Sequence, residues 1–141
     1  MKVADILKVK GSYVFSVTSD TTVYDALLAM KEKNIGAVIV MDGGELKGIL
    51  SERDYARKII LMGKSSQETL VKEIMTENVF TVDASDTLET CMGLMSDKHI
   101  RHLPVVQNGI VTAMVSVSDV VKAIINAQRE TIDHLKNYIS Q

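Results

Sequence analysis

The chain of 141 residues is 46% hydrophobic and 24% charged, which is ordinary for a globular protein with enough material for one domain. Its formal net charge of −2 lacks the basic excess that non-specific nucleic-acid binding requires. No apolar run reaches the roughly 18 residues of a membrane span, and the N-terminus shows no secretory signal. We therefore expect a cytoplasmic protein that binds neither nucleic acid nor membrane.

The first half of the chain predicts alternating strands and helices. A short amphipathic segment, 3–7, predicts a lead-in helix, and Asp20-Thr21-Thr22 offers caps for a helix with apolar residues at helical spacing. The apolar run 37–41 favours a strand buried on both faces, and Asp42-Gly43-Gly44 is typical of a hairpin turn. The expected elements are strand 14–17, a helix from Thr22 that ends at 34–36, strands 37–41 and 46–50, and a helix from Ser51 to about Met62.

The second half repeats the first at an offset of 65 residues, so that residues 16–54 align with 81–119 without a gap. Identical pairs include Val17/Val82, Thr22/Thr87, Met30/Met95, Val40/Val105, Ser51/Ser116 and Asp54/Asp119. The expected elements are a lead-in helix at 71–75, strand 79–82, helix 87–98, strands 102–106 and 110–115, and a helix from Ser116. We place repeat 1 in 1–66, repeat 2 in 67–127 and a helical extension in 128–141. Because such a unit is too small to bury its own face, the repeats should share a core and a cleft.

The single cysteine, Cys91, excludes an internal disulfide and favours a reducing compartment. It aligns with Ala26, on the apolar side of a predicted helix. A buried structural residue is therefore favoured over a reactive thiol.

Both repeats place Ser-x-x-Asp where a strand meets a helix, at Ser51/Asp54 and Ser116/Asp119. One interpretation is a capping box, in which the serine and the acid satisfy free N–H groups of the helix. The other is a ligand site: the helix amides and the hydroxyl attract a phosphate, and the carboxylate accepts hydrogen bonds from a ribose diol. The two roles are compatible because each side chain has lone pairs to spare.

Basic residues lead into the predicted strand 102–106. Arg101 and His102 are either solvated groups at the strand's start or a clamp on an anionic phosphate, for which arginine offers a planar fork. Pro104, the only proline, belongs at a strand start or a bulge because it cannot donate to a ladder. His99 and His102 make a weak metal site, since no cysteine or cluster of carboxylates accompanies them. We expect no metal.

The last predicted helix is longer than its counterpart in repeat 1. Its apolar stripe has spacings of three and four residues and comprises Val121, Ile125, Gln128, Ile132, Leu135 and Ile139. The stripe either folds back onto the domain or docks on another chain. We favour docking in an isologous homodimer, because the paired repeats already supply a core.

The tandem β-α-β-β-α pattern, the Gly-h-h-Ser-x-x-Asp corners (h, hydrophobic) and the strand Ile-Arg-His-Leu-Pro-Val-Val together resemble a pair of CBS domains, named after cystathionine β-synthase. The resemblance covers Val3 to about Ala127. The chain is similar to stand-alone bacterial CBS-pair proteins. It implies an α/β (α+β) fold of two pseudo-symmetric repeats packed sheet to sheet, with a long C-terminal helix. It also implies a regulatory module that binds an adenine nucleotide (AMP, ATP or NAD) and carries no catalytic cofactor.

The resemblance further implies two related clefts, each built from the corner of one repeat and residues of the other. The first would use Asp54, Ser51 and Arg53 with Val79, Phe80, Ile100, Arg101 and His102. The second would use Asp119, Ser116 and Ser118 with Val14, Phe15, Ile35, Gly36 and Ala37. Since Gly36-Ala37 stand where repeat 2 has Arg101-His102, we expect the first cleft to bind phosphate better. Ile39 replaces Pro104 in repeat 1, a departure from the family pattern.

Three functions remain open from the sequence. The leading one is a homodimeric nucleotide sensor whose ligand changes the angle between repeats or chains, which a downstream protein then reads. The second is a nucleotide-hydrolysing enzyme using His102 or His99 as base, but the chain has no P-loop and no nucleophile–base–orienter set. The third is an interaction scaffold with empty clefts.

Overall fold

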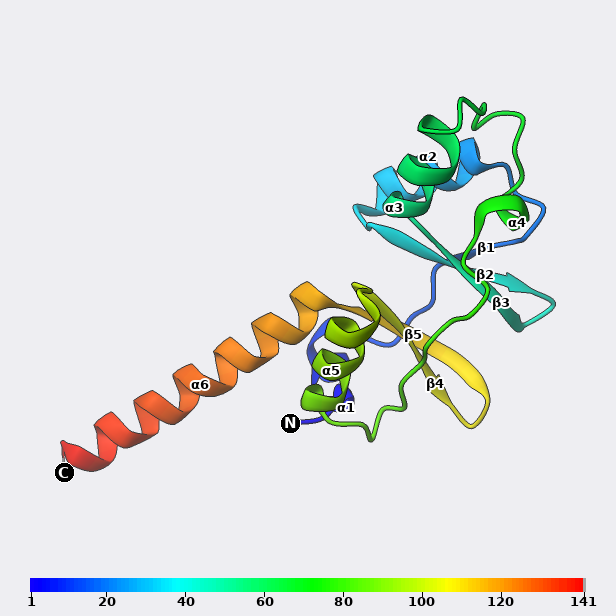
Figure 1. Cartoon of the computed structure of the whole chain (residues 1–141). Helices are drawn as coiled ribbons and strands as arrows, with labels where there is room; N and C mark the ends of the chain where they lie inside the picture. Colours follow the sequence, from blue (N-terminus) through cyan, green and yellow to red (C-terminus); the bar gives the residue numbers. More distant parts are fainter. Residues whose placement is uncertain (141) are drawn as a thin grey trace. The chain divides into compact units, whose positions relative to one another are not determined.

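The computed structural model describes residues 1–140 and divides the chain into two compact units (Figure 1). The repeat-1 unit contains Tyr13–Phe80 and Asn108–Val111, and the repeat-2 unit contains Met1–Ser12, Thr81–Gln107 and the chain from Thr112 onwards. The predicted α/β class is confirmed, with two sheets and a long C-terminal helix. No helix among residues 1–140 has the length and apolar character needed to cross a membrane.

The repeat-1 unit contains one three-stranded sheet. Strand β1 (Ser16–Val17) runs parallel to β2 (Ala37–Asp42), which pairs antiparallel with β3 (Glu45–Ser51). Its helices are α2 (Val23–Lys33), α3 (Glu52–Tyr55), the π-helix η1 (Ala56–Ile60) and α4 (Val71–Ile74). β2 is buried at its first four residues, as its apolar run predicts.

The repeat-2 unit repeats this plan with fewer paired strand residues. Strands β4 (His102–Gln107) and β5 (Ile110–Ser116) form a two-stranded sheet, and Val82 makes a single parallel bridge to Val105. Its helices are α1 (Val3–Lys10), α5 (Leu88–Lys98) and α6 (Val117–Ile139). The Val82–Val105 bridge is the counterpart of the Val17–Val40 pair in repeat 1.

Each lead-in helix packs in the core of the other repeat: α1 precedes repeat 1 but packs in the repeat-2 unit, and α4 precedes repeat 2 but packs in the repeat-1 unit. Val3, Ile6 and Leu7 of α1 lie in one cluster with buried side chains of α5, β4, β5 and α6. Val71 and Ile74 of α4 lie in the other cluster, with side chains of α2, β2 and β3. The units therefore differ from a division made by chain order, because the N-terminal helix belongs to the repeat-2 unit.

Helices α2 and α5 begin and end with the same chemistry. Thr22 and Thr87 are the N-caps, and each side-chain oxygen accepts a hydrogen bond from the backbone N–H three residues on. Asn34 and His99 are the C-caps, both with φ of 54° in the left-handed region. His99 thus terminates a helix at the position where the aligned residue is an asparagine.

The one proline explains a difference between the two sheets. In repeat 1, Ile39 of β2 pairs with Ser16 of β1. Pro104 occupies the equivalent place in β4 and has no N–H to offer, although its carbonyl accepts a 3.0 Å hydrogen bond from the N–H of Val82. Pairing on this side of β4 therefore stops after one residue.

Four predicted elements differ from the structure in extent, the first being the lead-in helix expected at 3–7, which extends to Lys10 as α1. The strand expected at 14–17 is confined to Ser16–Val17, and that at 79–82 is reduced to the bridge at Val82. The single helix expected from Ser51 to about Met62 is divided into α3 and η1. Cys91 is buried, and burial raises the pKa of its thiol, in agreement with the structural role predicted for it.

Helix α6 continues well beyond its contacts with α1 and α5 (Figure 1). Val120 is its one fully buried residue, and every residue from Gln128 to Ser140 is exposed. The apolar stripe does not fold back onto the rest of the unit, so that alternative from the sequence is wrong.

Candidate functional site

Both Ser-x-x-Asp corners are capping boxes at the start of a helix. Ser51 Oγ accepts a 3.2 Å hydrogen bond from the N–H of Asp54, whose Oδ2 accepts a 3.0 Å bond from the N–H of Ser51. Ser116 and Asp119 make the same pair of bonds, at 3.2 and 2.8 Å. The capping interpretation is therefore confirmed, and it accounts for only part of each carboxylate's hydrogen-bonding capacity.

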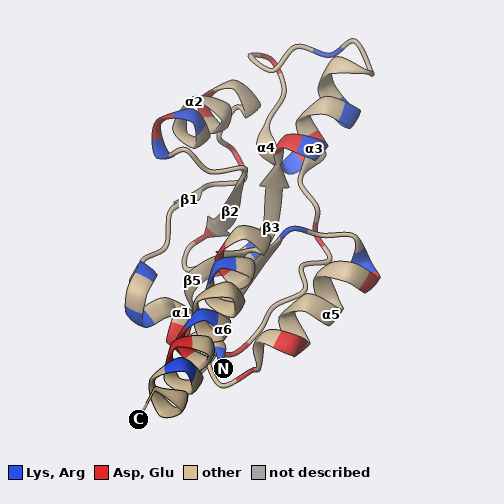
Figure 2. Ribbon diagram, turned by 90° about the vertical axis from the view of Figure 1, so that its left-hand side faces the viewer, with Lys and Arg blue, Asp and Glu red and all other residues tan. Residues whose placement is uncertain are grey.

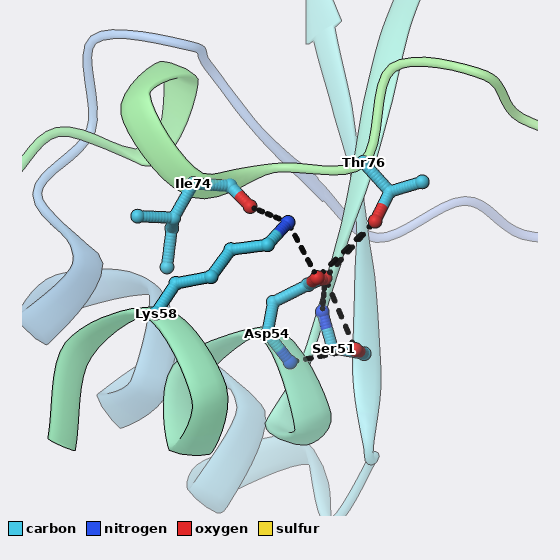
Figure 3. A network of polar contacts seen from close by, with 5 residues as sticks. All are labelled: Ser51, Asp54, Lys58, Ile74 and Thr76. Carbon is cyan, nitrogen blue, oxygen red and sulfur yellow. Dashed lines mark hydrogen bonds and ion pairs between the residues drawn. The ribbon is translucent and has the colours of Figure 1, made fainter. Parts of the chain in front are cut away.

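Asp54 has two further partners, both in the repeat-1 unit (Figure 3). Lys58, one helical turn later, places Nζ 3.0 Å from Asp54 Oδ1 and donates a 2.8 Å hydrogen bond to the carbonyl of Ile74. Thr76 Oγ1 donates to the same carboxylate at 3.2 Å. Asp54 is only 7% exposed, so these donors compensate for the loss of water around a buried charge. The lysine also ties η1 to the end of α4.

Gly48 allows the segment after α4 to reach this carboxylate. Thr76 and Ile49 of β3 exchange backbone hydrogen bonds of 3.0 and 2.9 Å. A Cβ at Gly48 would lie 2.7 Å from the Thr76 carbonyl oxygen, a distance that side chains do not tolerate against backbone. The close approach brings the short threonine side chain within reach of Asp54.

Asp119 is held by a different cation, in the repeat-2 unit. Lys10, the last residue of α1, places Nζ 2.7 Å from Asp119 Oδ2 and donates a 2.7 Å hydrogen bond to the carbonyl of Met114. Burial acts to raise the pKa of Asp119, but the hydrogen bonds from Lys10 and Ser116 outweigh it and hold the pKa below its ordinary value. The carboxylate therefore stays ionised at neutral pH.

The two corners use partners from aligned segments of the chain. Lys10 aligns with Met75, and the neighbouring Thr76 is the residue that reaches Asp54. The counterpart of Gly48 is Ala113, and a long lysine rather than a short threonine spans the distance there. Lys58 aligns with Ala123, so the second corner has no cation at the equivalent position of its own helix.

Arg101 and His102 lie beside the Asp119 corner within the repeat-2 unit. The carbonyl of Arg101 accepts a 2.9 Å hydrogen bond from the N–H of Val117, the first residue of α6. Burial lowers the pKa of His102, and repulsion from Lys10 and Arg101 lowers it further, against an attraction to Asp119. His102 is therefore neutral at pH 7. Lys10 and Arg101 are thus close enough to His102 for their positive charges to act on it.

The remaining predicted residues are divided between the units. Ser51, Asp54, Arg53, Val79 and Phe80, and likewise Val14, Phe15, Ile35, Gly36 and Ala37, belong to the repeat-1 unit, whereas Ile100, Arg101, His102, Ser116, Ser118 and Asp119 belong to the repeat-2 unit. Arg53, Phe80 and Ser118 are exposed, and Ala37 is buried. Ile35 and Gly36 line a shallow pocket with Glu52, whose N–H donates to the Gly36 carbonyl at 3.1 Å.

Two residues that the sequence predicts to contact a ligand, Phe15 and Ile100, also pack against the hydrophobic cores. Phe15 packs on the core of the repeat-1 unit, with the ammonium of Lys33 5.6 Å from its ring centroid. Ile100 packs on the core of the repeat-2 unit. Within residues 1–140, no group of three or more His, Cys, Asp or Glu residues is arranged to hold a metal ion.

The sequence reasoning missed Lys58, Thr76 and Lys10. Lys58 carries a local signal, because an acid and a lysine four residues apart face each other on a helix. Thr76 and Lys10 carry none by themselves, since they reach the acids through tertiary packing. The only pointer to them is that Lys10 ends one lead-in helix and Thr76 follows the other, at adjacent positions of the repeat.

Both corners lie in segments that match a known family. The family model for the CBS domain matches residues 3–61 and 71–126, one match for each repeat. The chain belongs to the CBS-domain family. It is 42% identical over 147 residues to the CBS domain-containing protein CBSX3, mitochondrial, of Arabidopsis thaliana. This match covers 97% of the chain and 71% of that protein. The match to CBSCBSPB2 of the same plant, at 33% identity, covers 80% of this chain and only 21% of the longer relative.

Solved CBS-domain structures agree in fold. A candidate signal-transduction protein with CBS domains from Burkholderia ambifaria MC40-6 gives a TM-score of 0.87 at 44% identity, covering 91% of this chain and 96% of that one. The hexameric CBS-CP12 protein from bloom-forming cyanobacteria gives 0.76 at 25% identity, covering 96% and 82%. The resemblance seen in the sequence is thus confirmed.

Proposed function

We propose that this CBS pair is a regulatory module that binds adenine nucleotides such as AMP, ATP or NAD. The observation that carries the proposal is the pair of carboxylates, Asp54 and Asp119, which the fold keeps at the starts of two helices with hydrogen-bonding capacity beyond their capping role. A carboxylate can accept two hydrogen bonds from a ribose diol, and helix N-termini favour phosphate.

In this proposal each ligand contacts both repeats. Asp54, Ser51 and Arg53, with Val79 and Phe80, receive a nucleotide whose other contacts are Ile100, Arg101 and His102. Asp119, Ser116 and Ser118 receive the second, with Val14, Phe15, Ile35, Gly36 and Ala37. Lys10 adds a cation to the second site, since its Nζ already lies 2.7 Å from Asp119. The expected disadvantage of the second site for phosphate is therefore smaller than Gly36-Ala37 alone suggest.

We further propose that the chain acts in the cytoplasm as a homodimer whose ligand-dependent conformation is read by a downstream protein. The Burkholderia relative named as a candidate signal-transduction protein and the hexameric cyanobacterial relative support a self-associating signalling role. A nucleotide shifts such a switch only by its difference in affinity for the two states.

A thermal-shift panel tests the proposal. AMP, ADP, ATP and NAD should raise the melting temperature of the full chain, because a ligand that binds only the folded state stabilises it. Guanosine and cytidine monophosphates are the matched controls for the base, and ribose 5-phosphate for the shared sugar and phosphate. A flat response to every adenine nucleotide would favour the scaffold hypothesis, and steady release of phosphate from ATP and Mg²⁺ would favour the enzyme.

A further inference from the structure

The two Ser-x-x-Asp corners present a ligand with equivalent helix starts. The N–H of Glu52 donates a 3.1 Å hydrogen bond to the carbonyl of Gly36. The aligned N–H of Val117 donates a 2.9 Å bond to the carbonyl of Arg101. In each corner the N–H of the aspartate donates to the serine hydroxyl at 3.2 Å. Because the same backbone groups are engaged in both corners, a difference in ligand binding must come from the side chains.

The charges at the first two helical positions do not separate the corners either. Glu52 and Arg53 at the start of α3 have opposite charges, and Figure 2 shows both signs there. The aligned Val117 and Ser118 of α6 are uncharged. Since the two charges of α3 offset each other, neither helix start has a net charge that would favour a phosphate over the other.

The aspartates themselves differ in how many of their lone pairs the protein already engages. Asp54 receives donors on both carboxylate oxygens (Figure 3). Its Oδ2 accepts from the N–H and from the hydroxyl of Ser51, both at 3.0 Å. Its Oδ1 lies 3.2 Å from Thr76 Oγ1 and 3.0 Å from Lys58 Nζ. A carboxylate has about four lone-pair sites, so these four donors saturate Asp54.

Asp119 keeps one oxygen open within its own unit. Its Oδ2 accepts from the N–H of Ser116 at 2.8 Å and from Lys10 Nζ at 2.7 Å. Among the described residues of the repeat-2 unit, 1–12, 81–107 and 112–140, no hydrogen bond is made to Oδ1. The hydroxyl of Ser116 also attracts this carboxylate, more weakly than Lys10 does. The Asp119 side chain is 23% exposed, against 10% for Asp54.

This difference changes what a ribose diol must displace. A diol donates two hydroxyl groups, and Oδ1 of Asp119 has two lone pairs that can accept both while Lys10 stays in place. At Asp54 the same diol must displace Thr76 and Lys58. Neutral hydroxyls then replace an ammonium beside a nearly buried carboxylate, and hydrogen bonds to a charged donor are the stronger kind.

We propose that Lys58 and Thr76 lower the nucleotide affinity of the Asp54 corner, so that the Asp119 corner fills first. This inference rests on the proposed nucleotide binding and adds the order in which the two sites fill. It reverses the order that the sequence alone suggests.

Isothermal titration of AMP into the full chain tests the order of filling. The wild type should show two classes of sites that differ in affinity by about 10-fold or more. Asp119→Asn should remove the tighter class, whereas Asp54→Asn should leave it in place. A single site per chain that only Asp119→Asn removes would also support the inference.

Substitutions of Lys58 test the cause. Lys58→Met should tighten the weaker class by about 10-fold, or bring it into the measured range, because Asp54 then has an oxygen open to the ribose. A purely structural role of Lys58 predicts weaker binding instead. Lys58→Arg keeps a cation beside the carboxylate and should retain the low affinity. Lys64→Met, on the exposed connector, is the control and should bind like the wild type.

Circular dichroism should show the Lys58 variants folded, since this side chain is 44% exposed. A wild type that binds no AMP would overturn the proposed function and this inference with it. Two classes of equal affinity, or loss of the tighter class in Asp54→Asn, would overturn the order of filling while nucleotide binding stands. A weaker class that Lys58→Met leaves unchanged would overturn the role of Lys58.

Discussion

Lys10 and Asp119 lie 109 residues apart in the chain, yet Nζ of the lysine is 2.7 Å from Oδ2 of the acid. The contact exists because α1 packs in the core of the repeat-2 unit, where Val3 and Ile6 are buried with residues of α5 and α6. It joins the N-terminal helix to the carboxylate that we propose as a ribose ligand. Any ligand that competes for Asp119 therefore acts on α1 as well.

Replacing Lys10 by methionine should raise the pKa of Asp119. Burial favours the protonated form, and the variant lacks the lysine hydrogen bond and charge that favour the ionised one. The ion pair is partly exposed, so we expect a loss of about 1 kcal/mol in the free energy of unfolding at neutral pH. Carbon-detected NMR of the side-chain carboxyls during an acid titration measures the shift. An Asp119 titration curve that matches the wild type would show that Lys10 does not hold this carboxylate in solution.

Gly48→Ala should destabilise the protein by about 1–3 kcal/mol, because the new methyl group meets the Thr76 carbonyl oxygen at 2.7 Å. The segment after α4 must then move away from β3 and take Thr76 with it. Gly93→Ala is the control: an added Cβ there has no neighbour within 4 Å, and alanine favours the helix α5. Urea unfolding of the two variants should give changes of opposite sign. Equal stabilities would contradict the close approach.

Lys58→Met should cost about 1 kcal/mol and loosen the end of α4, since Lys58 joins Asp54 to the Ile74 carbonyl. The ammonium is partly exposed, which keeps the cost below that of a fully buried pair. Hydrogen exchange should show faster opening of the Thr76–Ile49 backbone bonds in the variant. Lys64→Met, on the exposed connector, is the matched control, and it should leave those amides unchanged.

His102 should make stability fall as the solution is acidified through the weakly acidic range. Burial and the nearby Lys10 and Arg101 lower its pKa below 6.5, and the attraction of Asp119 only partly opposes them. The unfolded chain then binds a proton at a higher pH than the folded one, so the contribution of neutral His102 is full above about 6.5 and is lost as pH falls through the folded pKa. The free energy of unfolding, measured with denaturant at several pH values, should depend less steeply on pH in His102→Gln. Identical profiles would show that His102 does not contribute.

The repeat explains why so much of the fold could be predicted from the sequence. Local signals appear twice, and the same Thr-capped helices, hairpin turns and Ser-x-x-Asp corners recur at one offset. Propensity and capping are short-range, so α2, α5, β2 and β4 occur where the sequence predicts them. The π-turn at η1 was not predictable, because a one-residue change in helical hydrogen bonding leaves the apolar spacing nearly unchanged.

The site was predictable only in part, because local patterns identify its capping pairs but not its tertiary contacts. The capping pairs Ser51/Asp54 and Ser116/Asp119 are local, and their pattern identifies them. Lys10 and Thr76 contact the acids because the lead-in helices α1 and α4 pack where they do, which depends on tertiary contacts that no local pattern contains. Strand 79–82 was overestimated because Pro104 removes a donor from the facing strand, an effect that acts across the sheet.

The central claim is that Asp54 and Asp119 are the ribose ligands of an adenine-nucleotide module. Isothermal titration of AMP into the wild type, Asp54→Asn and Asp119→Asn tests it most directly, with Asp25→Asn, at an exposed residue of α2, as the control. We predict that each of the first two substitutions removes one class of sites or weakens it by about 10- to 100-fold, while the control binds like the wild type. Unchanged affinity and stoichiometry in both variants would contradict the account.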